Sequence, residues 1–198
     1  PANEVYSFAA GDEGFERQTW QDSQACTALA RVVSGPANTT ACLAVSVHLD
    51  EDTTNFGKGE VFLDMAQHLP NGIVIPANLR DRAVTAWVYC PAPLGGPGTN
   101  PNSVQVFCKD ANWKALYGSP VQVVQESWMP VSVTPGTNVP AGGWMQDGFD
   151  PAQIRLVGVK IGAGTDSGAR YDGMMYVDGI GFTPIPEPIV TNDLRYGF

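Results

Sequence analysis

One segment of the chain brings together side chains whose types and spacing suit sugar binding. Alternation over residues 103–109 places Gln105, Phe107 and Lys109 on one face, and Trp113 and Tyr117 follow in a polar, turn-forming stretch. A pyranose ring offers an apolar C–H face to an aromatic ring, while its hydroxyls need amide and ammonium partners. We therefore expect Phe107, Trp113 and Tyr117 to contact sugar rings and Gln105 and Lys109 to bond their hydroxyls. The alternative is an ordinary solvated strand face, with Trp113 folded back over a sheet edge.

Further aromatic residues are candidates for the same surface. Trp87 and Tyr89 alternate with small apolar residues, so both rings face either the ligand or the core. Trp144 lies in a long Gly-rich loop, a place where binding residues are often found. Trp20 and Trp128 lie in expected strands, where a tryptophan is more often packed. We include Trp87, Tyr89 and Trp144 in the predicted site.

Catalytic chemistry has little support in the sequence. Glycosidases need two carboxyl groups about 5 to 10 Å apart, and Glu60 and Asp64, four residues apart on one expected strand, satisfy that spacing. The third acid of the Glu-x-Asp-x-x-Glu pattern of laminarinase-like enzymes is missing. His48 and His68 have no nucleophilic Ser or Cys motif near them in sequence and form no zinc-ligand pair. We expect a protein without enzymatic activity.

The elements that must position these residues are β-strands. The chain has 198 residues with 22 glycines and 16 prolines, and no window sustains a helical period of apolar residues. Short alternating segments recur every ten to fifteen residues between turn-forming clusters. We expect strands at 4–8, 18–21, 27–34, 42–49, 59–65, 82–90, 103–109, 120–124, 128–134, 154–162 and 174–182. This pattern predicts one all-β domain, a β-sandwich of two antiparallel sheets, over residues 1–183, and a Pro-rich linker with the possible start of a following module over 184–198.

Charge and hydropathy restrict the partners. The formal net charge of -9, with only 11 Lys plus Arg, does not suit nucleic acid, whose binding requires clustered basic residues. No segment approaches the roughly 18 to 20 consecutive apolar residues that span a bilayer. We expect no nucleic-acid partner and no membrane span.

The four cysteines leave two alternatives. An acidic chain with few lysines suits an oxidising, extracellular setting, and we expect the protein to be secreted. Cys26 and Cys42 would lie at opposite ends of one hairpin, too far apart for a disulfide, and Cys90 and Cys108 meet the same objection if their strands pair directly. Buried thiols and longer-range disulfides both remain open.

Several segments, taken in order, resemble a known family. They include the opening Val5-Tyr-Ser-Phe8, the central Val104-Gln-Val-Phe-Cys-Lys-Asp110, the Phe149-Asp-Pro151 turn and the closing Tyr176-Val-Asp-Gly-Ile-Gly-Phe182. Together they are similar to jelly-roll carbohydrate-binding modules attached to bacterial glycoside hydrolases such as mannanases and endoglucanases. The resemblance implies a jelly-roll module that binds a β-linked polysaccharide, a β-glucan or β-mannan, and targets a covalently linked hydrolase to it. The alternative is a structural or protein-interaction domain of a secreted multimodular enzyme.

The resemblance also implies a structural calcium ion. In such modules acidic residues and carbonyl groups near the first strand hold the ion together with an aspartate of the last strand, here Asp178. This chain has Ala9 where the family usually has an acid, so Asp12 or Glu13 would have to substitute. The alternative is that Asp178 bonds local backbone N–H groups.

Overall fold

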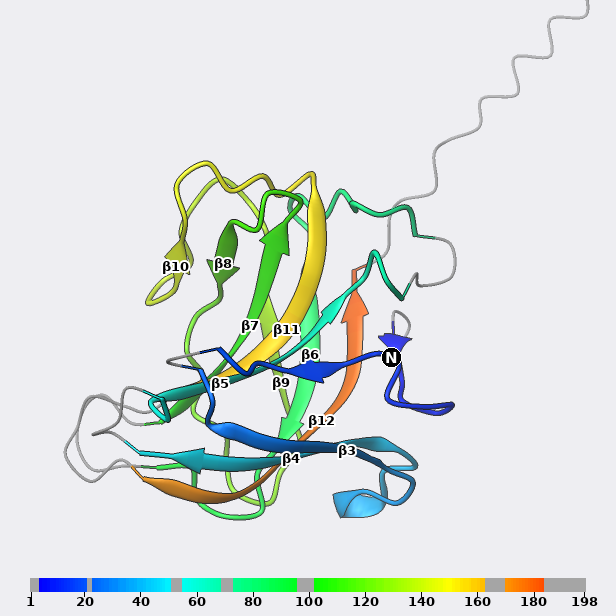
Figure 1. Cartoon of the computed structure of the whole chain (residues 1–198), viewed down its shortest axis with the longest axis vertical. Coiled ribbons are helices and arrows are strands. Elements are labelled where there is room, and N and C mark those ends of the chain that lie inside the picture. Colours follow the sequence, from blue (N-terminus) through cyan, green and yellow to red (C-terminus); the bar gives the residue numbers. More distant parts are fainter. Residues whose placement is uncertain are drawn as a thin grey trace, which may run out of the picture.

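The computed structural model describes residues 4–20, 23–50, 55–68, 73–95, 102–162 and 170–183. The predicted linker over 184–198 lies outside these ranges. The described residues contain twelve strands in two six-stranded sheets, together with one 3₁₀ turn, η1 (Pro36–Asn38). They include no helix with the length and hydropathy to cross a membrane. The predicted all-β class is confirmed (Figure 1).

The first sheet contains the β3–β4 hairpin and the last strand of the chain. Its order is β3 (Cys26–Val32), β4 (Cys42–Leu49), β12 (Tyr171–Phe182), β6 (Val84–Tyr89) and β9 (Met129–Val133), and β1 (Glu4–Tyr6) also pairs with β12.

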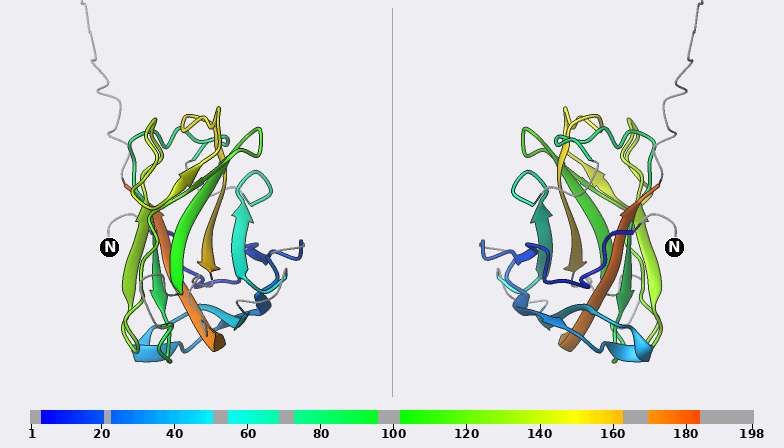
Figure 2. Two further views of the ribbon diagram at one scale, coloured as in Figure 1. Left: turned by 90° about the vertical axis from the view of Figure 1, so that its left-hand side faces the viewer. Right: turned by 90° about the vertical axis from the view of Figure 1, so that its right-hand side faces the viewer.

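The second sheet carries the segment on which the predicted site depends. Its order is β10 (Trp144–Met145), β8 (Ala115–Tyr117), β7 (Ser103–Asp110), β11 (Ile154–Gly162), β5 (Lys58–Asp64) and β2 (Glu16–Arg17). Each of the pairings between named strands is antiparallel. The chain crosses from one sheet to the other after β1, β2, β4, β5, β6, β8, β9 and β11, which gives the predicted jelly-roll sandwich (Figure 2).

Alternating side chains fill the space between the sheets. From β7, Val104, Val106 and Cys108 point inward, and from β4 Leu43 and Val45 do the same; all are buried. Because successive strand residues point to opposite faces, this inward row fixes Gln105, Phe107 and Lys109 on the outer face of the second sheet. That part of the prediction is confirmed.

The shortest strands differ from the prediction. No strand forms over the described residues 18–20 of the strand expected at 18–21; β2 lies before them, at Glu16–Arg17. The strand expected at 120–124 contributes only an isolated bridge between Val104 and Val121. The strands β8 and β10 were not expected at all. Strands of two or three residues are too short to show alternation, and their pairing with β7 and with each other decides their conformation.

All four cysteines are free and buried. Cys26 lies beside Val47 and Cys42 beside Val32, so these two cysteines occupy opposite ends of the β3–β4 hairpin, as expected. Burial raises the pKa of the Cys26 thiol to about 12. Such thiols are protonated and unreactive near neutral pH, so the buried-thiol alternative describes this structure.

Candidate functional site

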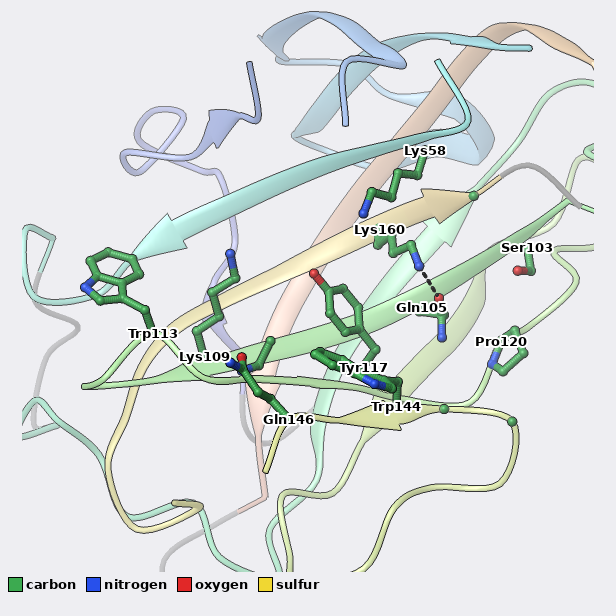
Figure 3. Close-up of a pocket in the computed structure, with 14 residues that line it drawn as sticks. Lys58, Ser103, Gln105, Lys109, Trp113, Tyr117, Pro120, Trp144, Gln146 and Lys160 are labelled. Carbon is green, nitrogen blue, oxygen red and sulfur yellow. Dashed lines mark hydrogen bonds between the residues drawn. The ribbon is translucent and has the colours of Figure 1, made fainter. Parts of the chain in front are cut away.

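The outer face of the second sheet is hollowed into a cleft of about 660 Å³. Strands β5, β7, β8, β10 and β11 and the loops beside them contribute its lining, and Figure 3 shows the side chains that surround it. The lining consists of Lys58, Ser103, Gln105, Lys109, Trp113, Ala115, Tyr117, Pro120, Gly142, Gly143, Trp144, Gln146, Lys160 and Gly162. Five of the eight predicted carbohydrate-binding residues therefore line one cavity.

A row of aromatic rings crosses the cleft. Strand pairing places Trp144 beside Tyr117, Tyr117 beside Phe107, and Phe107 beside Gly158. Phe107 and Tyr117 stack with 5.1 Å between ring centroids, and Tyr117 and Trp144 are tilted at 6.0 Å. Of these rings, Tyr117 and Trp144 line the cleft, and the row is open to solvent at Trp144, which is 52% exposed.

Phe107 is the buried end of this row and does not reach the surface. Its side chain is 0% exposed, and a Cβ added at Gly158 would lie 2.6 Å from its ring. Gly158 thus leaves the space that Phe107 fills, and Phe107 supports Tyr117 from below. The prediction that Phe107 stacks on sugar rings is therefore wrong: the outward alternation was right, but Tyr117 covers the ring.

A buried aspartate holds the loop that presents Trp113. Asp110 accepts hydrogen bonds through Oδ1 from the backbone N–H groups of Asn112 (2.8 Å) and Lys114 (2.9 Å), and through Oδ2 from that of Asp150 (2.9 Å). Trp113 closes the turn by donating its N–H to the Asp110 carbonyl at 3.0 Å. Its φ of 64° is in the left-handed region, which a bulky residue rarely adopts. The turn aims the indole outward.

Trp113 is both exposed and supported. Its side chain is 48% exposed, and the Arg155 guanidinium lies 4.7 Å from the ring centroid. Arg155 is fixed in turn by Asp64, to which its Nη2 donates at 2.7 Å. Those hydrogen bonds hold the pKa of the Asp64 carboxyl below its usual range. A cation that is itself anchored therefore orients the ring.

The polar side chains of the cleft form a connected group. Lys160 Nζ donates to Gln105 Oε1 at 3.1 Å, and Gln105 Nε2 donates to the Gly118 carbonyl at 2.7 Å. The Lys160 ammonium also lies 4.8 Å from the centroid of the Tyr117 ring, and the Tyr117 hydroxyl donates to Glu60 Oε1 at 2.8 Å. Gln105 lines the cleft as predicted, with its amide oriented by two partners.

Lys109 links the cleft to a second exposed tryptophan. Its ammonium lies 5.5 Å from the ring centroid of Trp20 and 5.9 Å from that of Phe107. Trp20 is 67% exposed, so the expectation that it is packed is wrong. The aromatic surface on this side of the sheet thus extends past Lys109 to Trp20.

Trp87 and Tyr89 do not belong to this cleft. Both lie on β6 in the first sheet, and Tyr89 is buried against Trp128 and Tyr176 at 5.5 and 6.1 Å between ring centroids. Alternation indicated an outward direction but not the sheet to which the strand belongs. The prediction that Trp87 and Tyr89 join Trp113 in one site is wrong.

The residues expected around calcium make other contacts. Asp178 accepts hydrogen bonds from the Thr39 hydroxyl at 3.3 Å and from the Gly179 N–H at 2.8 Å, and Asp12 accepts one from the Gly14 N–H at 3.1 Å. The carbonyls of Phe8 and Ala9 accept hydrogen bonds from the Arg31 guanidinium.

A guanidinium on these carbonyls does not suit a calcium site, where oxygen atoms must converge on the ion itself. Within the described ranges no three His, Cys, Asp or Glu residues are grouped to hold a metal ion. Glu13 lies beside Tyr6, whose pKa is raised by burial and by the Glu13 charge. Calcium binding through Asp178, Asp12 and Glu13 stays a prediction, and no role below depends on it.

Several cleft residues were missed from the sequence. Alternation in β5 and β11 places Lys58 and Lys160 on the outer face, because Val61, Val159 and Ile161 point inward, but it does not show that these two strands pair. Asp110 and Gln146 had no comparable signal, since each acts through the loop geometry around β8.

Comparison with known proteins places the fold. No protein-family profile matches the chain, and no curated protein sequence does. Among solved structures, the CBM22-1–GH10 modules of Clostridium thermocellum endo-1,4-β-D-xylanase 10B, complexed with xylohexaose, match with a TM-score of 0.53 at 13% identity. This match covers 94% of the present chain and 29% of that chain.

The CBM27-1 module of Caldicellulosiruptor saccharolyticus, complexed with mannohexaose, matches with a TM-score of 0.53 at 14% identity, covering 91% of the present chain and 96% of the module. The fold is therefore the β-sandwich of carbohydrate-binding modules, as the sequence resemblance implied.

Proposed function

We propose that this chain is a non-catalytic carbohydrate-binding module whose cleft holds a stretch of β-linked polysaccharide with a glucan or mannan backbone. The module would be secreted and would keep a covalently linked glycoside hydrolase close to its substrate. Tethering raises the effective concentration of the enzyme at the polysaccharide, so a modest affinity is enough.

The observation that carries the proposal is the pairing of exposed rings with fixed polar groups in one open cleft. Trp113 and Trp144 are each about half exposed. Lys109 lies between them along the cleft, and Gln105 and Lys160 lie on the other side of Tyr117 and Trp144 (Figure 3). The rings supply apolar faces for sugar C–H groups, and the amide and ammonium groups supply hydrogen bonds at the ring edges. Both tryptophans lie on loops or short strands held by the sheet, which suits a preformed site.

The carboxyl groups on the same face support binding without cleavage. Glu60 and Asp64 lie four residues apart on β5, which corresponds to about 13 Å between their Cα atoms. In glycosidases the two carboxyl groups themselves lie roughly 5 to 10 Å apart, and here each carboxyl group is held by another side chain. Both residues are buried, Glu60 accepting from the Tyr117 hydroxyl and Asp64 from Arg155. Each carboxyl group thus has a structural partner in the free protein.

The test is affinity gel electrophoresis against soluble β-glucans, β-mannans and xylans. Wild type is run beside Trp113→Ala in the cleft and Trp87→Ala on the other sheet. We expect wild type and Trp87→Ala to be retarded by at least one polysaccharide and Trp113→Ala to migrate faster on the same gel.

The outcomes separate the alternatives. Unretarded migration of wild type on every gel would overturn the binding function and favour a structural or protein-interaction domain. Retardation that Trp113→Ala leaves unchanged and Trp87→Ala weakens would move the site to the first sheet. Release of reducing ends from any of the polysaccharides would show catalysis.

A further inference from the structure

Positive charge is concentrated in the cleft of a strongly acidic protein. The net charge is -9, and the sequence contains four lysines, Lys58, Lys109, Lys114 and Lys160. All except Lys114 line the cleft. No Asp or Glu belongs to the lining that the described residues form. A random surface of this composition would place about two acidic residues beside each basic one, so the cleft reverses the charge of the chain.

Two of these lysines are held close to each other. Lys58 and Lys160 lie on the neighbouring strands β5 and β11, and Lys58 pairs with Gly162, the last residue of β11 (Figure 3). Burial lowers the pKa of Lys160, and the charge of Lys58 lowers it further, while Glu60 acts in the opposite direction. Two like charges in a half-buried position are unfavourable in the free protein, and a bound anion would relieve their repulsion.

The nearby acidic residues offset this charge only in part. Glu60 is 3% exposed and accepts a hydrogen bond from the Tyr117 hydroxyl, so its carboxylate lies below the cleft surface. Asp64 forms its ion pair with Arg155. With one carboxylate beneath three lining lysines, the cleft surface keeps an excess of positive charge.

The hydrogen-bonding character of the lining points the same way. A sugar hydroxyl both donates and accepts, and sites for neutral sugars need acceptors as well as donors. The lysine ammonium groups have donors only, and the amide oxygen of Gln105 already accepts from Lys160. A lining dominated by donors matches a group that only accepts, such as a carboxylate or a sulfate.

From this charge and donor pattern we infer that the cleft recognises acidic groups on the polysaccharide, either uronic-acid carboxylates or sulfate esters. Lys58 and Lys160 bind the acidic group and Trp144 contacts the sugar ring beside it, while Trp113, at the other end of the cleft, contacts a ring further along the polysaccharide (Figure 3). The inference rests on the proposed function, because it names the class of polysaccharide that the same cleft takes.

The experiment compares acidic polysaccharides with neutral partners of the same backbone. The probes are carboxymethylcellulose with hydroxyethylcellulose, glucuronoxylan with its carboxyl-reduced form, and a sulfated galactan with its desulfated form. Wild type is titrated with each by calorimetry at about 0.05 M and about 0.5 M NaCl, where charge interactions are respectively strong and screened. Lys58→Gln/Lys160→Gln is the test variant. Arg170→Gln, which removes an exposed charge just before β12, is the control, with circular dichroism to check folding.

We expect at least one acidic polysaccharide to bind about tenfold or more tightly than its neutral partner, with the preference lost at high salt and in Lys58→Gln/Lys160→Gln. Arg170→Gln should keep it. The pair in which the preference is found tells carboxylate from sulfate. Neutral partners bound as tightly as the acidic forms would overturn this inference and leave the proposed function intact, and so would an acidic preference that the double lysine variant retains. The proposed function itself would be overturned if wild type bound none of the six probes and none of the β-glucans, β-mannans and xylans.

Discussion

Substitutions at Trp113 can separate two effects: the free-energy cost of its left-handed backbone conformation and the contribution of its side chain to binding. The residue combines a φ of 64° with an indole that is 48% exposed. Trp113→Ala removes the ring and keeps a Cβ in the left-handed region. Trp113→Gly removes the ring and also the steric cost of that conformation. Both variants lose the contact with Arg155 equally, so their difference isolates the backbone.

The structure gives the size of both effects. A tryptophan side chain has up to about 250 Å² of surface, of which roughly 120 Å² is accessible here, and a sugar ring on one face would cover about 60 Å². At about 25 cal/mol per Å² this contributes about 1.5 kcal/mol, or about tenfold in Kd. The left-handed conformation costs a residue with a Cβ about 1 kcal/mol, so Trp113→Gly should unfold with a free energy about 1 kcal/mol higher than Trp113→Ala.

Two measurements on the same three proteins check this reasoning. Calorimetric titration with the best-retained polysaccharide should show both variants binding about tenfold more weakly than wild type. Urea unfolding should rank Trp113→Gly above Trp113→Ala. Wild-type affinity in both variants would refute the contact with the ligand. Equal stability of the two variants would refute the claim that this turn holds Trp113 in a strained conformation.

Three further changes test the rest of the site. Trp144→Ala should weaken binding about tenfold by the same area argument, which titration measures; unchanged affinity would remove this ring from the site. Asp110→Ala should lower the free energy of unfolding by about 3 kcal/mol, because three backbone N–H groups lose their acceptor; a loss below about 1 kcal/mol in urea would contradict that account. Asp64→Asn should cost about 2 kcal/mol at neutral pH through its bonds to Arg155. The pKa of Asp64 is lowered in the folded state, so this stabilisation is present above about pH 4 and is lost as the pH falls further. Urea unfolding should therefore show the stabilities of the variant and wild type converging in acid. A difference that stays constant with pH would argue against the ion pair.

The sequence predicted the core better than the cleft. Residues 42–49 and 154–162 are strands with the predicted bounds, because long alternating segments carry a clear signal of period two. The same alternation oriented Gln105 and Lys109 correctly. It failed for Phe107, since alternation fixes the side of the sheet on which a ring lies but not whether Tyr117 covers it.

The composition of the site depends on pairing over long distances in sequence. Trp87 and Tyr89 were grouped with Trp113 because alternation allowed both rings to face a ligand, yet β6 and β7 belong to opposite sheets. Lys58 and Lys160 are about a hundred residues apart in sequence and meet only through the β5–β11 pairing. No local pattern records that pairing, so the charge of the cleft was visible only in the folded chain.

The indole N–H resonances of the five tryptophans test the location of the site most directly. Trp113 and Trp144 line the cleft, while Trp87 and Trp128 lie on or beside the first sheet. The account predicts that adding the bound oligosaccharide, in an NMR titration with each resonance assigned by substitution, shifts the signals of Trp113 and Trp144 and leaves those of Trp87 and Trp128 unchanged. Shifts of Trp87 and Trp128 without shifts of Trp113 and Trp144 would contradict it.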